Sequence, residues 1–144
     1  MIILKEITKD NFWECVRLSV GEDQLEFVTT NGISIAQSKL QPECIPVAVY
    51  KNDEMIGFIM YCIDEEDHEY WIYRLMIDQK YQGLGYGTKT LEKILKIIKL
   101  DKQHHKIFIG VHKESIAAVQ LYQKAGFEFN GQTFGKEQIM VLNY

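Results

Sequence analysis

Three glycines at alternate positions, Gly83, Gly85 and Gly87, constrain this chain more than any other feature. The run before them, YWIYRLMI, is rich in aromatic and branched residues and predicts a strand. The run after them has the apolar spacing of an amphipathic helix. A strand, a glycine turn and a helix in this order present free backbone N–H groups at the positive end of a helix dipole. Because glycine has no Cβ, we expect a phosphate group to approach this turn closely.

Two common phosphate motifs do not fit this turn. The Walker pattern needs a lysine directly after its last glycine, but here Gly87 is followed by Thr88 and then Lys89. The dinucleotide fingerprint needs a third glycine where this chain has Thr90. The turn therefore belongs to another class of phosphate site.

Composition limits the other function classes. A chain of 144 residues suits one domain, which we place at residues 1–144. The net charge of −4 and the absence of a basic block disfavour binding to nucleic acid or to an anionic membrane. The three cysteines, Cys15, Cys44 and Cys62, have no CxxC spacing, so we expect reduced thiols and no metal site. No charged leader or long apolar run is present, and we expect a cytoplasmic location.

The hydrophobic pattern predicts a mixed α/β layer fold with the element order β-α-α-β-β-β-α-β-α-β-β. Thr8 or Asp10 is the expected N-cap of the first helix, and Pro42 ends the second helical region, which is broken near 31–32. Gly126 is the expected C′ residue of the last helix. The expected strands are 2–8, 46–63 as a hairpin with its turn at 51–54, 70–77, 106–111, 127–131 and 138–144. The expected helices are 9–20, 24–40, a helix that follows the three glycines and ends at 98, and 115–126.

The string Gln82–Gly87 fits the pattern Q/R-x-x-G-x-G/A, and at this point the chain resembles the GNAT family of acyl-CoA N-acyltransferases. The later segment SIAAVQLYQKAGF resembles the family's N-x-x-A-x-x-L-Y-x-x-x-G-F. The resemblance extends over essentially the whole chain. It implies a mixed, mostly antiparallel central sheet with helices on both faces and a splay between the fourth and fifth strands.

The resemblance also implies acetyl-CoA as co-substrate, with no metal. Backbone groups of Leu75, Met76 and Ile77 are then expected to bond to the pantetheine arm. Tyr86 either packs in the core or leans on the cofactor. Ser115 stands where the family usually carries asparagine, so it either bonds to the pantetheine or caps the following helix. The expected pyrophosphate turn consists of Gln82, Gly83, Leu84, Gly85, Tyr86, Gly87 and Thr88.

Tyr122 matches the family's tyrosine beside the sulfur of coenzyme A. A phenol there can give a proton to the departing thiolate. Position alone would favour a core tyrosine on an amphipathic helix, and only the L-Y-x-x-x-G-F context points to catalysis.

The general base is less well defined. Many polyamine acetyltransferases carry a glutamate near Tyr73, but the strand 70–75 holds no carboxylate. Glu69 is the nearest acid, and it acts either as a base through water or as a solvated turn residue. His112 follows the fifth strand and is a further candidate for acid or base work.

Several stretches, among them EMIGFIMY and YWIYRLMIDQKYQGLGYG, look like those of bacterial spermine/spermidine acetyltransferases. A cationic polyamine would need carboxylates and aromatic faces. The candidate carboxylates of the early helical segment are Glu22, Asp23 and Glu26, and the candidate rings are Tyr70, Trp71 and Tyr73. The acidic residues between 64 and 69 are equally consistent with a solvated hairpin tip.

We therefore expect acetylation of a small-molecule polyamine by direct attack in a ternary complex, and a homodimer. The alternatives are another amine or a protein N-terminus as acceptor, and a non-catalytic acyl-CoA-binding module.

Overall fold

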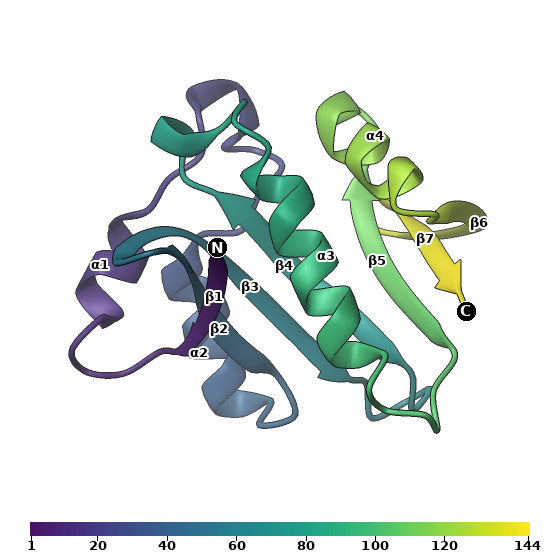
Figure 1. Cartoon of the computed structure of the whole chain (residues 1–144). Coiled ribbons are helices and arrows are strands. Elements are labelled where there is room, and N and C mark those ends of the chain that lie inside the picture. The colour runs from purple at the N-terminus through teal and green to yellow at the C-terminus, as the bar shows by residue number, and fades with distance from the viewer.

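The computed structural model describes all residues, 1–144, as seven strands in one sheet with four α-helices and two short 3-10 helices (Figure 1). The strand order is β1-β2-β3-β4-β5-β7-β6. The elements are β1 (Ile2–Glu6), α1 (Phe12–Arg17), η1 (Glu22–Gln24), α2 (Asn31–Leu40), β2 (Ile45–Lys51), β3 (Glu54–Ile63), β4 (Tyr70–Ile77), η2 (Gln79–Tyr81), α3 (Tyr86–Ile98), β5 (Lys106–His112), α4 (Ile116–Lys124), β6 (Glu128–Phe134) and β7 (Glu137–Asn143).

The pairing of β4 with β5 confirms the predicted splay. These two strands are the sheet's parallel pair, and their register runs only from Tyr70 opposite Ile107 to Ile72 opposite Ile109. Beyond these residues the strands diverge, and Figure 1 shows their C-terminal ends on either side of the start of α3. All other neighbours in the sheet are antiparallel, including the predicted β2-β3-β4 meander.

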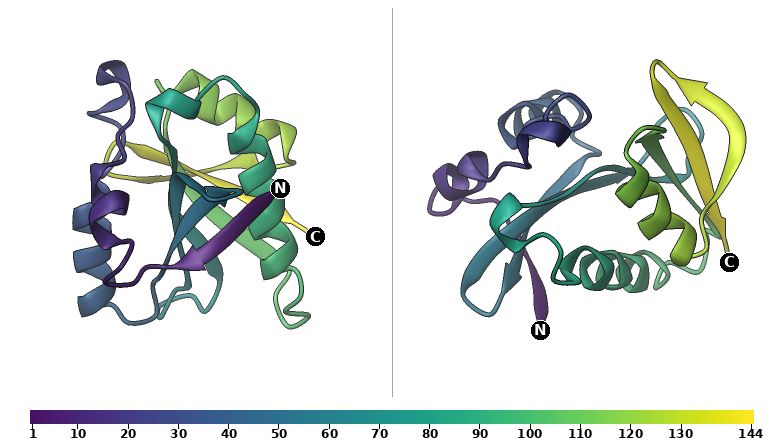
Figure 2. Two further views of the ribbon diagram at one scale, coloured as in Figure 1. Left: turned by 60° about the vertical axis from the view of Figure 1, so that its left-hand side comes forward. Right: turned by 90° about the horizontal axis from the view of Figure 1, so that it is seen from above.

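The helices cover both faces of the sheet, as predicted. Figure 2 shows α1 and α2 on one face and α3 and α4 on the other. The larger core cluster lies under α3 and α4 and includes Leu91, Ile94 and Ile98. The smaller cluster lies under α1 and α2 and includes Cys15, Phe58 and Met60. Each face of the central strands is therefore buried, which explains why β3 reads as a continuous apolar run rather than as an alternating one.

Some predicted helix boundaries are confirmed and others are wrong. Gly126 has a φ of 103° directly after the C-cap of α4, as a C′ glycine requires. The amphipathic helix after the glycines is α3. The N-cap of α1 is Asn11, not Thr8 or Asp10, and the Asn11 Oδ1 accepts a hydrogen bond from the Thr8 N–H at 2.7 Å.

The second helical region begins later than predicted, and the break expected near 31–32 is instead the start of a helix that continues to Leu40. Residues 25–30 form no α-helix, and α2 begins at Asn31 with Thr30 as its N-cap. The Thr30 side chain accepts a hydrogen bond from the Ile33 N–H, which caps the start of the helix. The β-branched run Val28–Thr30 disfavours an earlier start. This loop is thereby free to lie over the splay. None of the helices is both long and apolar enough to span a bilayer.

Candidate active site

The glycine turn leaves six successive backbone donors free. Gly83 and Gly85 have φ values of 77° and 85°, and Gly85 is the N-cap of α3. A Cβ added at either glycine would meet no protein atom within 4 Å, so the space in front of the turn is open. The N–H groups of residues 83–88 donate no hydrogen bond to any backbone acceptor. The turn is therefore an anion cradle with the dipole of a 13-residue helix behind it.

A cavity of about 400 Å³ runs from this turn to the splay. No lysine or arginine lines it, so the attraction for an anion comes from the backbone N–H groups and the helix. The residues of the predicted cofactor site that line it are Leu75, Met76, Ile77, Gln82, Gly83, Gly85, Tyr86, Gly87 and Ser115, together with Tyr122.

Two residues of the predicted turn do not line the cavity. Leu84 is 61% exposed and Thr88 is also exposed, so any contact from them comes through their N–H groups. The Gln82 side chain braces the turn. Its side-chain amide donates to the Ile77 carbonyl at 2.9 Å and to Gln24 Oε1 at 3.0 Å, which ties the turn to β4 and to η1.

A second cavity of about 90 Å³ occupies the splay itself. Its walls are the C-terminal halves of β4 and β5, and the loop 27–29 lies over it. The register between β3 and β4 skips Tyr73, which forms a bulge directly after the last β4–β5 pair. Tyr73 and Arg74, the two residues at this bulge, both line the splay cavity.

Tyr122 lines both cavities, and the residue is only 6% exposed, with its ring against Phe127 in the core under α4. Burial raises the pKa of its phenol, and the nearby Glu137 carboxylate raises it further. The phenol is therefore held in its protonated form, as a proton donor requires.

Ser115 occupies the N-cap position of α4, but its side chain makes no capping hydrogen bond. It lines both cavities, so its hydroxyl is available to a ligand. Of the two roles expected for this hydroxyl, capping of the helix is therefore absent.

Four predicted site residues lie away from both cavities. Glu22 and Glu26 are exposed and line neither, whereas their neighbours Asp23 and Phe27 do.

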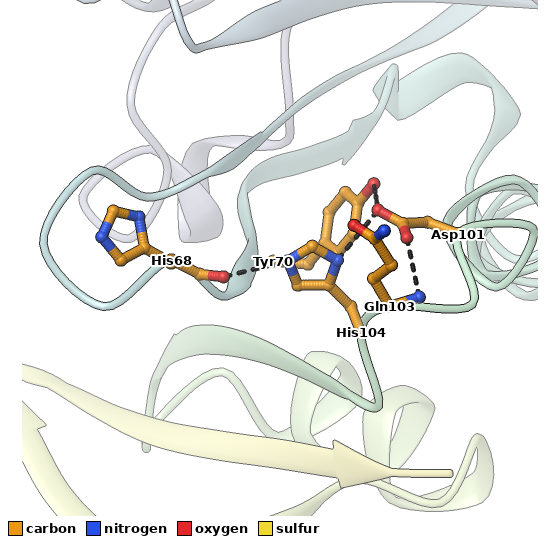
Figure 3. Close-up of polar contacts among 5 residues, drawn as sticks. All are labelled: His68, Tyr70, Asp101, Gln103 and His104. Carbon is orange, nitrogen blue, oxygen red and sulfur yellow. Dashed lines mark hydrogen bonds and ion pairs between the residues drawn. The ribbon is translucent and has the colours of Figure 1, made fainter.

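Glu69 and Tyr70 stand at the opposite end of β4, about 17 Å along the strand from Leu75. There Tyr70 donates to Asp101 Oδ2 at 3.0 Å, and the same oxygen lies 2.8 Å from His104 Nδ1 (Figure 3). This network ties the β3–β4 turn to the α3–β5 loop, a structural role.

Tyr73 is the predicted acceptor residue that does reach the splay cavity. Its hydroxyl donates to Asp64 Oδ2 at 2.6 Å, which fixes the ring. His112 also lines this cavity, and its ring packs on Phe27 with centroids 4.4 Å apart. The Glu114 N–H donates to His112 Nδ1 at 3.2 Å, so in the neutral ring Nε2 carries the proton.

Among the residues of the splay cavity that sequence reasoning missed, Arg74, Gly110 and Glu137 bear on its chemistry. Arg74 donates to Gln37 Oε1 on α2 at 3.1 Å, while its buried Nε has no partner. Burial lowers the pKa of Arg74. The sequence did hold one signal, because a lone glycine inside the strand KIFIGVH is typical of a close approach by another group.

The model of the acetyltransferase (GNAT) family matches residues 8–127, a range that includes both the glycine turn and Tyr122. The chain belongs to the GNAT acetyltransferase family. A spermine/spermidine N(1)-acetyltransferase of Bacillus subtilis is 30% identical over 147 aligned positions, which cover 97% of each chain.

Solved structures share the GNAT fold at lower identity. The PaiA N-acetyltransferase of Thermoplasma acidophilum, in complex with coenzyme A, has a TM-score of 0.73 at 20% identity and covers 100% of this chain and 99% of its own. The spermidine N-acetyltransferase of Vibrio cholerae, in complex with CoA and spermine, has a TM-score of 0.75 at 15% identity and covers 97% and 92%. At these identities the likeness concerns the fold.

Proposed function

We propose that this GNAT chain transfers an acetyl group from acetyl-CoA to an amine nitrogen of a polyamine of the spermine or spermidine type. The observation that carries the proposal is the place of Tyr122. It lines both the cavity that starts at the anion cradle and the cavity in the splay. A proton donor at this junction suits a transfer between a phosphate-bearing donor and a second substrate.

Coenzyme A fits the long cavity by its chemistry. Its pyrophosphate would accept hydrogen bonds from the six free N–H groups of residues 83–88. The backbone of Leu75, Met76 and Ile77 and the Ser115 hydroxyl would hold the pantetheine arm, which leads toward Tyr122. Bound acetyl-CoA supplies an activated acetyl thioester, whose sulfur leaves as a thiol.

The polyamine acceptor is supported by the Bacillus subtilis relative, which aligns over 97% of both chains. Physical features of the splay agree with it. The ring of Tyr73 and the ring pair Phe27–His112 offer faces to an alkylammonium chain. Of the three acidic candidates Glu22, Asp23 and Glu26, only Asp23 lines the neighbouring cavity.

A thiol-release assay with acetyl-CoA tests the acceptor against spermine, spermidine, putrescine, lysine, an aminoglycoside and an N-terminal peptide. We expect saturable turnover with spermine or spermidine and little with the others. Turnover confined to another amine would overturn the polyamine acceptor but keep the acetyltransferase. Calorimetric binding of CoA without turnover of any amine would instead favour a binding module.

A further inference from the structure

Glu137, the first residue of β7, lines the cavity in the splay. It lies opposite His112 in the β5–β7 register, and Gly110 lies opposite Ile139. Because side chains alternate along strands, Glu137, Gly110 and His112 share one face of the sheet. Val111 and Met140 belong to the other face, since they pack in the core under α3 and α4. Glu137 thus faces the side of the sheet that carries α2 and the loop 27–29.

Gly110 makes room for the Glu137 carboxylate. A Cβ built on Gly110 would lie 2.8 Å from Oε1 and 3.3 Å from Cδ of Glu137. The backbone of Gly110 has no positive φ, so the absence of a Cβ, and not conformational freedom, is what this position uses. Any larger residue would move the carboxylate away from its place over β5.

Glu137 is the one carboxylate in the lining of the splay cavity. The other charged or titratable groups that face this cavity are Tyr73 and Arg74 on β4, His112 on β5 and Tyr122 on α4. None of them forms an ion pair with Glu137, because the chain's sole ion pair within 4.0 Å joins His104 to Asp101. The Glu137 carboxylate acts on the Arg74 guanidinium only through space, so its oxygens are open to a cationic group of a ligand.

We infer that Glu137 binds the reacting ammonium group of the acceptor and takes its proton. The inference rests on the function proposed above and supplies the base that function needs. In the balanced reaction, a protonated amine and an acetyl thioester give an amide, a thiol and one proton. The C–N bond forms and the C–S bond breaks. Nitrogen loses two protons, of which Glu137 passes the first to solvent.

The second proton returns to the acid. Tyr122 gives its phenolic proton to the sulfur as the C–S bond breaks, and the second proton from nitrogen restores the phenol. The base, Glu137, and the acid, Tyr122, thus line the splay cavity from different elements, β7 and α4. The carboxylate also helps to keep the Tyr122 phenol protonated, since it raises the pKa of that group.

The other candidate bases are less suited. Glu69 lies at the far end of β4. The Nδ1 lone pair of His112 is occupied by the Glu114 N–H, and the neutral ring therefore presents a donor at Nε2. Arg74 carries a positive charge and accepts no proton.

The first test compares wild type with Glu137→Gln, which keeps the size of the side chain and removes its charge. We expect kcat/KM for the best amine of the panel to fall about 100-fold, while CoA binding by calorimetry stays within about twofold. Glu137→Asp should recover part of the loss. Glu128→Gln is the matched control, because Glu128 lies on the same β6–β7 hairpin but is exposed.

The second test is a double-mutant cycle with Gly110→Ala, which displaces the carboxylate without neutralising it. Gly110→Ala should lower kcat/KM in the wild-type background and have almost no further effect beside Glu137→Gln. Equal losses in both backgrounds, or a Glu137→Gln variant within twofold of wild type, would overturn the inference. If wild type itself acetylates no amine of the panel, the proposed function falls instead.

Discussion

Ile72 and Ile109 form the last parallel pair between β4 and β5. Immediately beyond this pair, β4 carries its bulge at Tyr73 and β5 carries Gly110. Both features widen the gap that the diverging strands leave. The cavity in the splay is therefore lined from both faces of the sheet, by Tyr122 on α4 from one face and by Glu137 from the other.

Tyr122→Phe should lower kcat about 100-fold, because a benzyl side chain has no proton for the departing sulfur. CoA affinity by calorimetry should change less than twofold, since the ring still fills the same buried site. Tyr61→Phe is the control, because Tyr61 packs against the same core without lining either cavity. Unchanged kcat in Tyr122→Phe would remove the acid role.

Gly85→Val should weaken CoA binding at least 10-fold, or about 1.4 kcal/mol, because a side chain would fill the cradle. Gly131→Val is a closely matched control. Gly131 has a φ of 86°, against 85° for Gly85, and a Cβ there also meets nothing within 4 Å. Both variants should lose similar stability in urea unfolding, and only Gly85→Val should lose CoA affinity. Equal affinities in calorimetry would contradict the turn assignment.

Asp64→Asn should destabilise the protein by about 1 kcal/mol at pH 7, because Asp64 accepts the 2.6 Å hydrogen bond from Tyr73. That bond lowers the pKa of the Asp64 carboxyl in the folded state. The stabilisation is therefore full above the unfolded-state pKa of about 3.9 and is lost as the pH falls through the lower folded value.

Urea unfolding of wild type and Asp64→Asn at pH 7 and pH 2.5 measures this effect. The difference in free energy of unfolding should shrink at the lower pH. An exposed control, Asp53→Asn, should show little difference at either pH. A difference for Asp64→Asn that is the same at both pH values would show that the Tyr73 bond does not depend on the carboxylate charge.

Local patterns predicted the elements that position the donor. The three glycines, the amphipathic α3 and the C′ residue Gly126 each depend on a few neighbouring residues, and their physical reasons are visible in the sequence. The start of α2 was harder, because Thr30 competes as a cap with the apolar spacing that begins earlier.

The acceptor side depends on distant parts of the chain. Glu137 reaches the splay only because β7 pairs with β5, and no local pattern marks it. Glu22, Asp23 and Glu26 were chosen for charge, but of these only Asp23, inside η1, lines a cavity. The homodimer and the single domain at residues 1–144 stay predictions.

We expect the acetyl group to pass directly from acetyl-CoA to the amine, and the cysteines agree with this expectation. Cys15, Cys44 and Cys62 are buried and line neither cavity. Burial raises the pKa of Cys15 to about 11 and that of Cys62 to about 12, so neither offers a thiolate that could carry the acetyl group. We therefore expect the amine to attack the thioester while both substrates are bound.

Initial rates with acetyl-CoA and the best amine varied together test this claim most directly. We predict double-reciprocal lines that intersect, as a ternary complex requires. Parallel lines, together with an acetylated protein detected by mass spectrometry after incubation with acetyl-CoA alone, would contradict the account.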